Sequence, residues 1–373
     1  MAARGFDHVV WAVHDVEAAA NRLEAAGFTV TPRARHPWGT ENRLVQLDGF
    51  FIELLTIGAA AEIPPASDRF FSFGGFNRDF LERGEGASML VMESGSAEDD
   101  RRAFERAGLH VYEPFSFGRE QTRPDGSIRK VGFDLTFVRN PSDPLHGFFT
   151  CHNLYPENFW SADYQRHENG ATVLDTVVVV CEEPAEQHIF YAAFTGEREM
   201  RASSLGIAIE TPRGRLHLMP PSAFEALYGV PAPALVPGGS AIAALAVAGA
   251  DRAAVAQSLA RRSINAVESR EGLVLPAGAG AALPDGDYTL GLRPHHVTPA
   301  SAGRGGAELS GRVLVAELSG SETIVHVELG GITWVSQAHG IHPFEIGAEA
   351  PLRADMGRSL WFDRDGRLAA GGA

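Results

Sequence analysis

The sequence has very little lysine and cysteine, and each shortage excludes a class of protein. Among 32 lysine and arginine residues only Lys130 is a lysine, and Arg129 and Val131 flank it. A P-loop needs a lysine that follows glycine and precedes Ser or Thr, so the chain cannot carry a Walker-type ATPase site. The two cysteines, Cys151 and Cys181, are too few for a disulfide framework and indicate a reducing compartment.

Long apolar runs and an excess of positive charge are also absent. No apolar run approaches the ~20 residues that span a bilayer, and the first residues, MAARGFDHVV, lack the pattern of a signal peptide. We therefore expect a cytoplasmic protein without membrane insertion. The formal net charge of −15 argues against nucleic acid as a partner, because phosphate contacts need a basic face.

A pattern of one strand, one helix and three further strands recurs along the chain. The first copy has predicted strands at 5–13, 28–31, 43–48 and 50–57 and a helix at 16–26. Further copies begin with strands at 87–93, 174–180 and 241–248, followed by helices at 96–107, 184–194 and 251–262. Four such βαβββ modules predict an α+β fold in which the modules pair two by two, each pair closing a curved sheet around a cleft.

His8 and Glu53 are polar residues inside apolar strands of the first copy, in FDHVVWAV and GFFIELL. A histidine and a carboxylate on neighbouring strands, facing one side, can hold a divalent metal. The second copy has GFFTC where the first has GFFIE, so Cys151 takes the place of Glu53 and Ser88 that of His8. In the third copy His217 falls near the Glu53 position.

The character of the sequence changes near residue 283. Short alternating strands with glycine turns follow, and they predict a small all-β barrel. The expected domains are therefore a first module pair at 1–165, a second module pair at 166–282 and a barrel at 283–373.

Two family resemblances cover most of the chain. Residues 1 to about 280 resemble the vicinal oxygen chelate (VOC) superfamily, specifically its glyoxalase-like proteins, through FDHVVWAV with DVEAAANRLEAAGF, the loop RHPWGTENRL, FFIELL, TRPDGS and RHENGA. Residues from about 283 to 370 resemble the TOBE domain, an OB-like barrel of ABC-importer ATPase subunits, through LGLRPHHV, VLVAELSGSETIVHVELGG and LWFDRDGRL. The chain is thus similar to a glyoxalase-like protein fused to a transport-associated module, without the ATPase domain.

The first resemblance implies a divalent metal ion (Zn, Fe, Mn or Ni) held by residues of the first and last strands of paired modules. His8 and Glu53 match this pattern, and Glu53 would also act as the catalytic base. Cys151 does not match the usual glutamate. His152 follows it and becomes a further metal ligand only if a bulge turns it, because neighbouring residues of a regular strand face opposite ways.

A purely structural interpretation of these residues stays open at this point. His8 can be a core histidine that is hydrogen-bonded to Asp7, and Glu53 can be balanced by an arginine such as Arg43. Cys151 can be a buried, inert thiol.

Six further residues are candidates for substrate binding: His36, Trp38, Thr40, Asn42, Arg119 and Arg123. The first four lie in the loop RHPWGTEN, where turn chemistry is the alternative explanation. The two arginines precede the PDG turn at 124–126 and could bind a substrate carboxylate, or belong to a solvated hairpin.

The leading hypothesis is a metal-dependent lyase, isomerase or dioxygenase that acts on a small oxygenated metabolite. One alternative is a metal-free protein that binds a small molecule, as resistance proteins of the superfamily do. Another is an accessory component of an ABC importer without ATPase activity. The partners considered are a small-molecule ligand, a second copy of the chain in a homodimer, and transporter subunits contacted through the TOBE-like barrel.

Overall fold

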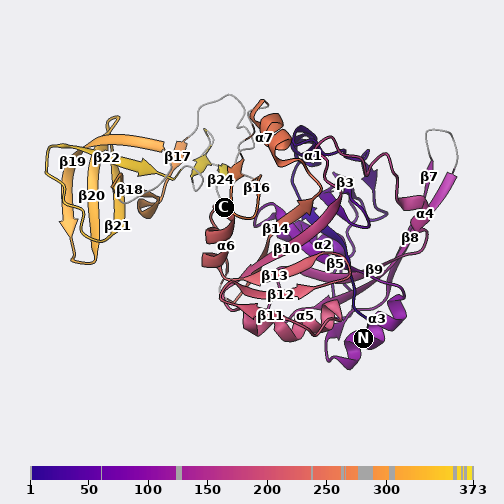
Figure 1. Cartoon of the computed structure of the whole chain (residues 1–373). Helices are drawn as coiled ribbons and strands as arrows, with labels where there is room; N and C mark the ends of the chain where they lie inside the picture. Colours follow the sequence, from indigo (N-terminus) through magenta and orange to yellow (C-terminus); the bar gives the residue numbers. More distant parts are fainter. Residues whose placement is uncertain are drawn as a thin grey trace. The chain divides into compact units, whose positions relative to one another are not determined.

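Two units make up the computed structural model, residues 1–276 and 277–373 (Figure 1). The structure describes residues 2–59, 61–122, 128–236, 238–261, 264, 266–275, 289–301, 307–355, 359–362, 364 and 368–371. The domain boundary expected at 282–283 and the candidate Arg123 lie outside these ranges. Among the described residues no helix has the length and the apolar character to cross a bilayer.

The first two modules of the larger unit form a continuous sheet. Module one consists of β1 (Phe6–Ala12), α1 (Val16–Ala25), β2 (Ala34–Arg35), β3 (Thr40–Gln46) and β4 (Phe51–Ile57). Module two consists of β5 (Gly86–Glu93), α3 (Ala97–Arg106), β6 (His110–Val111), β7 (Phe115–Thr122), β8 (Ile128–Arg139) and β9 (Gly147–Asn153), and α2 (Phe73–Leu81) precedes it. The strand order is β2-β3-β4-β1-β5-β9-β8, with β6 and β7 also paired to β8. β1 pairs with β5 in the antiparallel direction, and this pairing joins module one to module two.

The third and fourth modules repeat this plan in shortened form. Module three consists of β10 (Val173–Cys181), η1 (Pro184–Gln187), α5 (His188–Thr195), β11 (Arg201–Ser203), β12 (Gly206–Glu210) and β13 (Arg215–Met219). Module four consists of β14 (Ser240–Ala248), α7 (Arg252–Arg261), β15 (Val267–Glu268) and β16 (Leu273–Val274), and α4 (Pro156–Phe159) and α6 (Pro221–Tyr228) lie in the connections. β10 and β14 are antiparallel, as β1 and β5 are. This repetition confirms the predicted α+β fold of four modules.

Some local predictions were wrong for identifiable reasons. The segment 28–31 is β-prone in composition but is not a strand, and the Pro32 that follows it cannot donate to a strand ladder. The helices α2 and α6 were not predicted. The helix α2 contains two adjacent glycines, Gly74 and Gly75, and their low helix propensity made it hard to recognise in the sequence. Ser72 caps this helix by accepting a hydrogen bond from the Gly75 amide at 3.1 Å.

The sheet of the larger unit is covered on both faces. One face packs against α1, α3 and α5 through buried side chains such as Phe104 and Phe194. Figure 1 shows α3 and α5 together along one border of this unit, and the Phe104 and Phe194 rings lie 6.3 Å apart. The other face of the first module pair packs under α2 in a cluster rich in phenylalanine, including Phe73 and Phe149. The candidate site lies on this second face.

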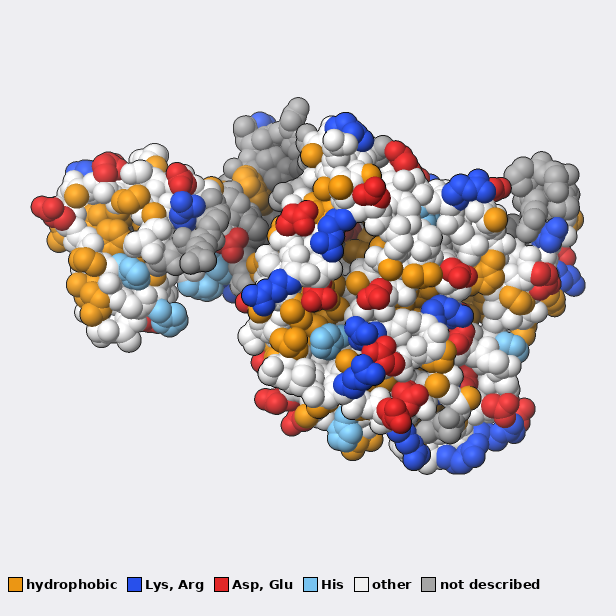
Figure 2. Space-filling model, viewed as in Figure 1, with side chains coloured by type: hydrophobic (Ala, Val, Ile, Leu, Met, Phe, Trp, Pro, Cys, Tyr) orange, Lys and Arg blue, Asp and Glu red, His pale blue; other side chains and the backbone are white. Residues whose placement is uncertain are grey.

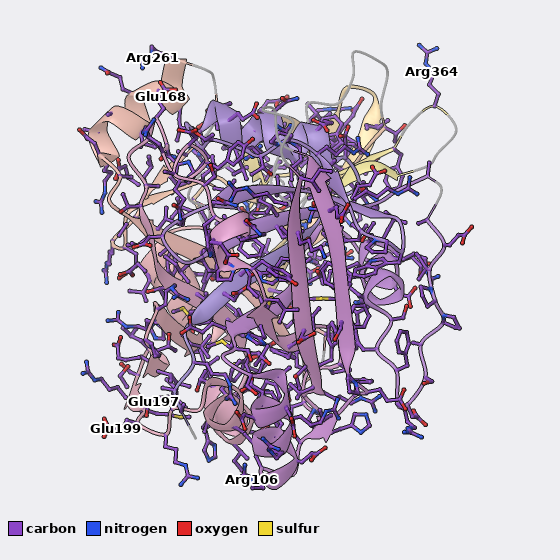
Figure 3. All side chains as sticks on the ribbon, turned by 90° about the vertical axis from the view of Figure 1, so that its right-hand side faces the viewer. Arg106, Glu168, Glu197, Glu199, Arg261 and Arg364 are labelled. Carbon is purple, nitrogen blue, oxygen red and sulfur yellow. The ribbon has the colours of Figure 1, made fainter. Side chains whose placement is uncertain are left out.

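Charged side chains are spread over the surface of the larger unit. Figure 2 shows acidic and basic side chains interspersed on the face in view. In Figure 3, Arg106, Glu197 and Glu199 extend outward from the rim of the molecule. Buried charges are therefore exceptions, and each needs a partner.

Arg4 makes one such buried contact, between the N-terminal segment and the helices α3 of module two and α5 of module three. Its guanidinium pairs with Asp100 of α3 at 2.6 Å, and the two side chains are only 7% and 10% exposed. The same group donates to the carbonyl oxygen of Phe194 at 3.2 Å and lies over the Phe104 ring. The pair thus ties the N-terminal segment to two helices.

Replacing Asp100 should test this contact. Asp100→Ala leaves the buried Arg4 charge without its partner, and we expect the free energy of unfolding to fall by about 3–5 kcal/mol. Asp99→Ala is the matched control, because Asp99 lies on the same helix turn but pairs with Arg102 at the surface. Chemical denaturation of the full chain measures both. Equal midpoints for the two variants would contradict the assignment.

The segment 140–171 packs its aromatic side chains next to the candidate site. Phe159 lies 5.1 Å from Phe51 between ring centroids. His167 fixes the segment to the sheet: its Nδ1 accepts from the Thr29 amide at 3.0 Å, and its Nε2–H donates to the Gln46 carbonyl at 2.8 Å. Only the neutral ring can make both bonds. Burial accordingly lowers the pKa of His167, although the bond to Gln46 raises it in part.

The lowered pKa of His167 predicts that the free energy of unfolding depends on pH. Because its folded-state pKa is below the unfolded value of about 6.5, its contribution is complete above pH 6.5 and is lost as the pH falls below that value. The free energy of unfolding should therefore decrease more steeply with acidification in the wild type than in His167→Phe. Parallel denaturation series between pH 7.5 and 5 would show the difference, and identical slopes would argue against it.

The smaller unit is an antiparallel, nearly closed barrel-like sheet. Its elements are β17 (Thr289–Gly291), η2 (Pro294–His296), β18 (Val297–Pro299), β19 (Ala307–Leu318), β20 (Glu322–Leu329), β21 (Ile332–His339), β22 (Glu349–Ala354), β23 (Leu360–Phe362) and β24 (Leu368–Gly371). Five of these strands follow the order β18-β22-β19-β20-β21 around a core that includes Val325 and Val327. Gly330 and Gly331, both with positive φ, form the turn between β20 and β21. The predicted all-β barrel is confirmed.

Candidate metal centre

The pairing of β1 with β4 brings His8 and Glu53 together. In this parallel pair His8 is opposite Phe51 and Val10 is opposite Glu53, so all four side chains face the same side of the sheet. His8 and Glu53 are each 4% exposed. The His8 Nε2 atom lies 3.9 Å from Glu53 Oε2. The imidazole ring is stacked on Phe51 at 4.3 Å, which holds it in this orientation.

The hairpin of β2 and β3 adds further polar groups around the same carboxylate. Asn42 Nδ2 donates a hydrogen bond to Glu53 Oε1 at 2.5 Å. The Nε2 atom of His36 lies 3.6 Å from the same oxygen, and its Nδ1 atom lies 2.8 Å from Thr40 Oγ1. The Trp38 ring is stacked on the His36 ring at 4.8 Å. The structure thus gathers four of the residues assigned to substrate binding around Glu53.

Glu53 differs from the other buried carboxylates. Among the described residues three carboxylates are buried, at Glu53, Asp100 and Asp143. Asp100 is paired with Arg4, and Asp143 lies 3.0 Å from the ring nitrogen of His146. Within the described part of the chain, no arginine or lysine side chain forms an ion pair with Glu53. Its nearest polar neighbours are the amide of Asn42 and the imidazoles of His8 and His36.

Arg43 does not balance Glu53, so that alternative is wrong. Its guanidinium lies 2.8 Å from Glu17 and 3.0 Å from Glu24, both on α1. Arg43 is adjacent to Asn42 on β3, and successive strand residues face opposite sides of the sheet. The side chain therefore belongs to the face covered by helices.

His36 is in the form that can bind a metal. Burial lowers the pKa of its imidazole to about 4, although the Glu53 carboxylate raises it in part. The ring is therefore neutral at physiological pH, and a neutral imidazole nitrogen is a common metal ligand.

Arg119 lies at the edge of this site. Burial lowers the pKa of its guanidinium, and the Glu53 charge offsets part of that effect. Its Nη1 donates to the Arg35 carbonyl at 3.0 Å. Arg119 also lines a groove of about 580 Å³ formed by β7, β8 and residues 154–155.

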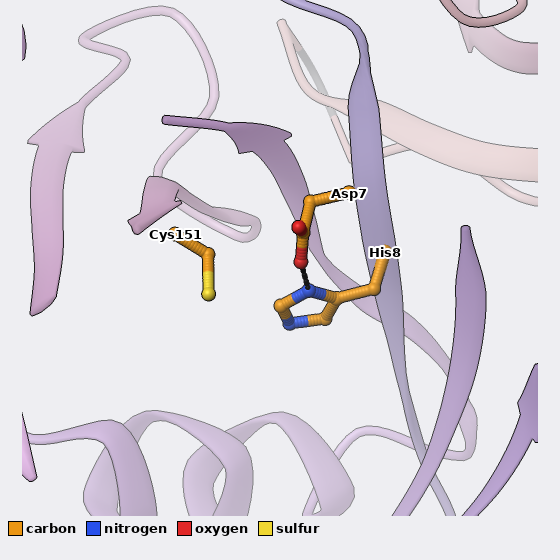
Figure 4. Close-up of side chains that lie close together, drawn as sticks. All are labelled: Asp7, His8 and Cys151. Carbon is orange, nitrogen blue, oxygen red and sulfur yellow. Dashed lines mark hydrogen bonds and ion pairs between the residues drawn. The ribbon is translucent and has the colours of Figure 1, made fainter. Parts of the chain in front are cut away.

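A β-bulge places Asp7 beside His8. Phe6 pairs with Met92 and His8 pairs with the next residue, Val91, so Asp7 has no partner on β5. Asp7 Oδ1 lies 2.5 Å from His8 Nδ1. Figure 4 shows Cys151 beside this pair, and one potential ligand atom from each of the three lies within 4.8 Å of the others.

The Cys151 thiol is held in its protonated form. Burial raises its pKa well above the ordinary value, and the neighbouring carboxylates of Asp7 and Glu53 raise it further. These causes apply to the metal-free protein; a bound divalent ion would itself favour the thiolate.

The structure does not bring His152 to the site. β8 and β9 pair without a register shift, with Leu135 opposite Cys151 and Asp134 opposite His152. The side chain of His152 therefore emerges on the opposite face from Cys151. The register also shows that Ser88 does not take the place of His8. His8 pairs with Phe51, the third residue of GFFIE, and Val91 pairs with Phe149, the third residue of GFFTC. Val91 is therefore the residue of module two that corresponds to His8.

The second module pair preserves the geometry of this site but not its chemistry. Val178 is opposite His217, in the same register as Val10 and Glu53. A register shift again leaves an aspartate, Asp175, unpaired, and Thr176 donates to it at 2.7 Å. A carboxylate at the Glu53 position is missing here.

Comparison with known proteins agrees with this architecture. Residues 6–195, about half of the chain, match the glyoxalase-like domain, so the chain belongs to the glyoxalase-like domain family. Residues 290–362 match the TOBE domain. No curated protein matches the chain. A solved structure described as a hypothetical protein from Staphylococcus aureus is similar at a TM-score of 0.47 and 13% identity, covering 58% of this chain and 86% of that chain, too remote to support any conclusion.

The residues around Glu53 fit a divalent metal ion. Two imidazoles and a carboxylate suit Zn, Fe, Mn and Ni. Two ligand atoms that are each about 2.1 Å from one ion can lie at most about 4.2 Å apart. The separations of 3.9 Å from His8 to Glu53 Oε2 and 3.6 Å from His36 to Glu53 Oε1 meet this limit. Ligand atoms taken one from each of the three residues do not all lie within 4.8 Å of one another, so the side chains would have to move closer together to share one ion.

A stability measurement on the metal-free protein tests the charge argument. Glu53→Gln keeps an acceptor for Asn42 but removes an unbalanced buried charge, so we expect the free energy of unfolding to rise by about 1 kcal/mol in the presence of a chelator. Glu41→Gln, which loses the contact of Glu41 with Arg33, should give no such gain. A loss of several kcal/mol in Glu53→Gln would show that the protein itself balances the charge.

Proposed function

We propose that the first module pair is a metal-dependent enzyme that acts on a small oxygenated metabolite, with His8 and Glu53 as metal ligands. The observation that carries this proposal is the buried Glu53 carboxylate, which faces two imidazole nitrogens and has no ion pair with a described arginine or lysine. A divalent ion bound there supplies Lewis-acid polarisation of substrate oxygens. Lyase and isomerase reactions fit this role, and a dioxygenase reaction would fit only if the ion were redox-active, such as iron.

The surrounding residues position the ligands. Asp7 accepts from His8 Nδ1–H and so leaves the Nε2 lone pair directed toward Glu53. Asn42 donates to Oε1 of Glu53, and in this proposal Glu53 is also the catalytic base that accepts a substrate proton. Phe149, edge-on to His8 at 5.5 Å, helps to keep water from the site.

Arg119 provides the positive charge for substrate recognition. It lines the groove, and the Glu53 charge acts on its guanidinium. In this proposal Arg119 binds an anionic group of the substrate, such as a carboxylate.

A non-catalytic binding protein is the second candidate. The substitutions at the remaining family positions, Cys151 and Thr176, support it, because neither supplies the usual ligand. A metal-free protein that binds a small molecule in the groove beside Arg119 would be compatible with these substitutions.

The TOBE domain has a binding role in this proposal, toward subunits of an ABC transporter. Val315, Leu318 and Ile332 are 45%, 54% and 61% exposed on its strands. Leu318 and Ile332 lie at opposite ends of the β20 ladder and form no single patch, so this role is supported by the match to the TOBE domain. The domain carries no P-loop lysine, so it adds no ATPase activity.

Metal analysis of the purified full chain tests the proposed enzyme. The wild type should contain about one divalent ion per chain, and His8→Ala and Glu53→Ala should lose it while remaining folded. His152→Ala is the matched control and should retain the ion. A folded wild type that takes up no added metal would rule out the metalloenzyme and favour the binding protein.

A further inference from the structure

We infer that His36 is the third protein ligand of the metal centre and completes a site of two histidines and one carboxylate. This inference rests on the proposed metal site. The family pattern takes its ligands from the first and last strands of the modules, whereas His36 lies just after β2, in the hairpin that leads to β3. The ligand set would therefore come entirely from module one.

The geometry of Glu53 supports this assignment. Its two oxygens face the two imidazoles separately, with Oε2 3.9 Å from His8 Nε2 and Oε1 3.6 Å from His36 Nε2. Both separations are too long for hydrogen bonds, and each is within the span of two ligands on one ion. The three ligand atoms as a set span more than 4.8 Å, so the proposal includes a small closing movement of the side chains on the ion. A cation between the rings explains why two imidazole nitrogens are directed at one buried carboxylate.

Each of the three side chains also has a partner that fixes its orientation. His8 Nδ1 lies 2.5 Å from Asp7, His36 Nδ1 lies 2.8 Å from Thr40, and Glu53 accepts from Asn42 at 2.5 Å. Metal-binding histidines almost always use their second ring nitrogen in this way, and bound carboxylates are hydrogen-bonded in turn. Stacking against Trp38 further restricts the His36 ring.

The competing third ligands fit less well. Asp7 is close to His8, but its oxygen is already engaged with the ring nitrogen that a metal-bound histidine uses for support. Cys151 is grouped with Asp7 and His8, on the side of the His8 ring whose Nδ1 is hydrogen-bonded to Asp7, and the Cys151→Ser variant tests it directly. His152 faces the other side of the sheet.

Cobalt binding by the full chain distinguishes these ligands. We would titrate Co²⁺ into the chelator-treated wild type and into His36→Ala, His36→Gln, Thr40→Val, Cys151→Ser and His152→Ala, and check folding by circular dichroism. His36→Ala and His36→Gln should each weaken binding by more than about 100-fold, and Thr40→Val by about 10–100-fold. Cys151→Ser and His152→Ala should bind as the wild type does. The wild-type spectrum should lack a sulfur-to-cobalt charge-transfer band.

Each contrary result has a definite meaning. Wild-type affinity in both His36 variants, with binding lost in His8→Ala and Glu53→Ala, would overturn the role of His36 and leave the proposed metal site in place. A sulfur-to-cobalt band that disappears in Cys151→Ser would make Cys151 the third ligand instead. A wild type that binds no cobalt, zinc, iron, manganese or nickel would overturn both.

Discussion

A carboxylate that is 4% exposed must have its charge balanced within the protein, and around Glu53 the described fold supplies mainly neutral groups. Asn42 donates one hydrogen bond, and the imidazoles of His8 and His36 face the two oxygens. Burial keeps His36 neutral, so it does not provide the missing charge. In the proposed function, a divalent ion held by these groups would balance the Glu53 charge and supply a Lewis acid for chemistry.

Strand pairing determines which groups surround Glu53. The β1–β4 register sets His8 and Glu53 on one face, and the β-bulge at Asp7 turns a second carboxylate toward His8. The third module repeats both features with Asp175 and Thr176, yet has His217 in place of the glutamate. The duplicated scaffold thus preserves the geometry, while the acidic residue is present in only one of the two copies.

The parts of this account that depend on local pattern could be predicted from the sequence. His8 and Glu53 stand out because polar residues are rare in apolar strands, and the alternating pattern of the barrel strands identifies the C-terminal module. The role of Asp7 could not be predicted, because a bulge is defined by the partner strand β5, which lies some 80 residues away. The sequence predicted substrate binding for His36; its position 3.6 Å from Glu53 could not be predicted, because a loop sequence does not show toward which side chain the hairpin turns. The ion-pair partners of Arg43 could not be predicted either, because they depend on which face of β3 the side chain occupies.

An anomalous difference map from crystals grown with cobalt, collected at the cobalt absorption edge, tests the central claim most directly. The account predicts one strong peak about 2.1 Å from His8 Nε2, from His36 Nε2 and from a Glu53 oxygen. A map with no peak beside Glu53, or with a peak bound instead by Asp7 and Cys151, would contradict it.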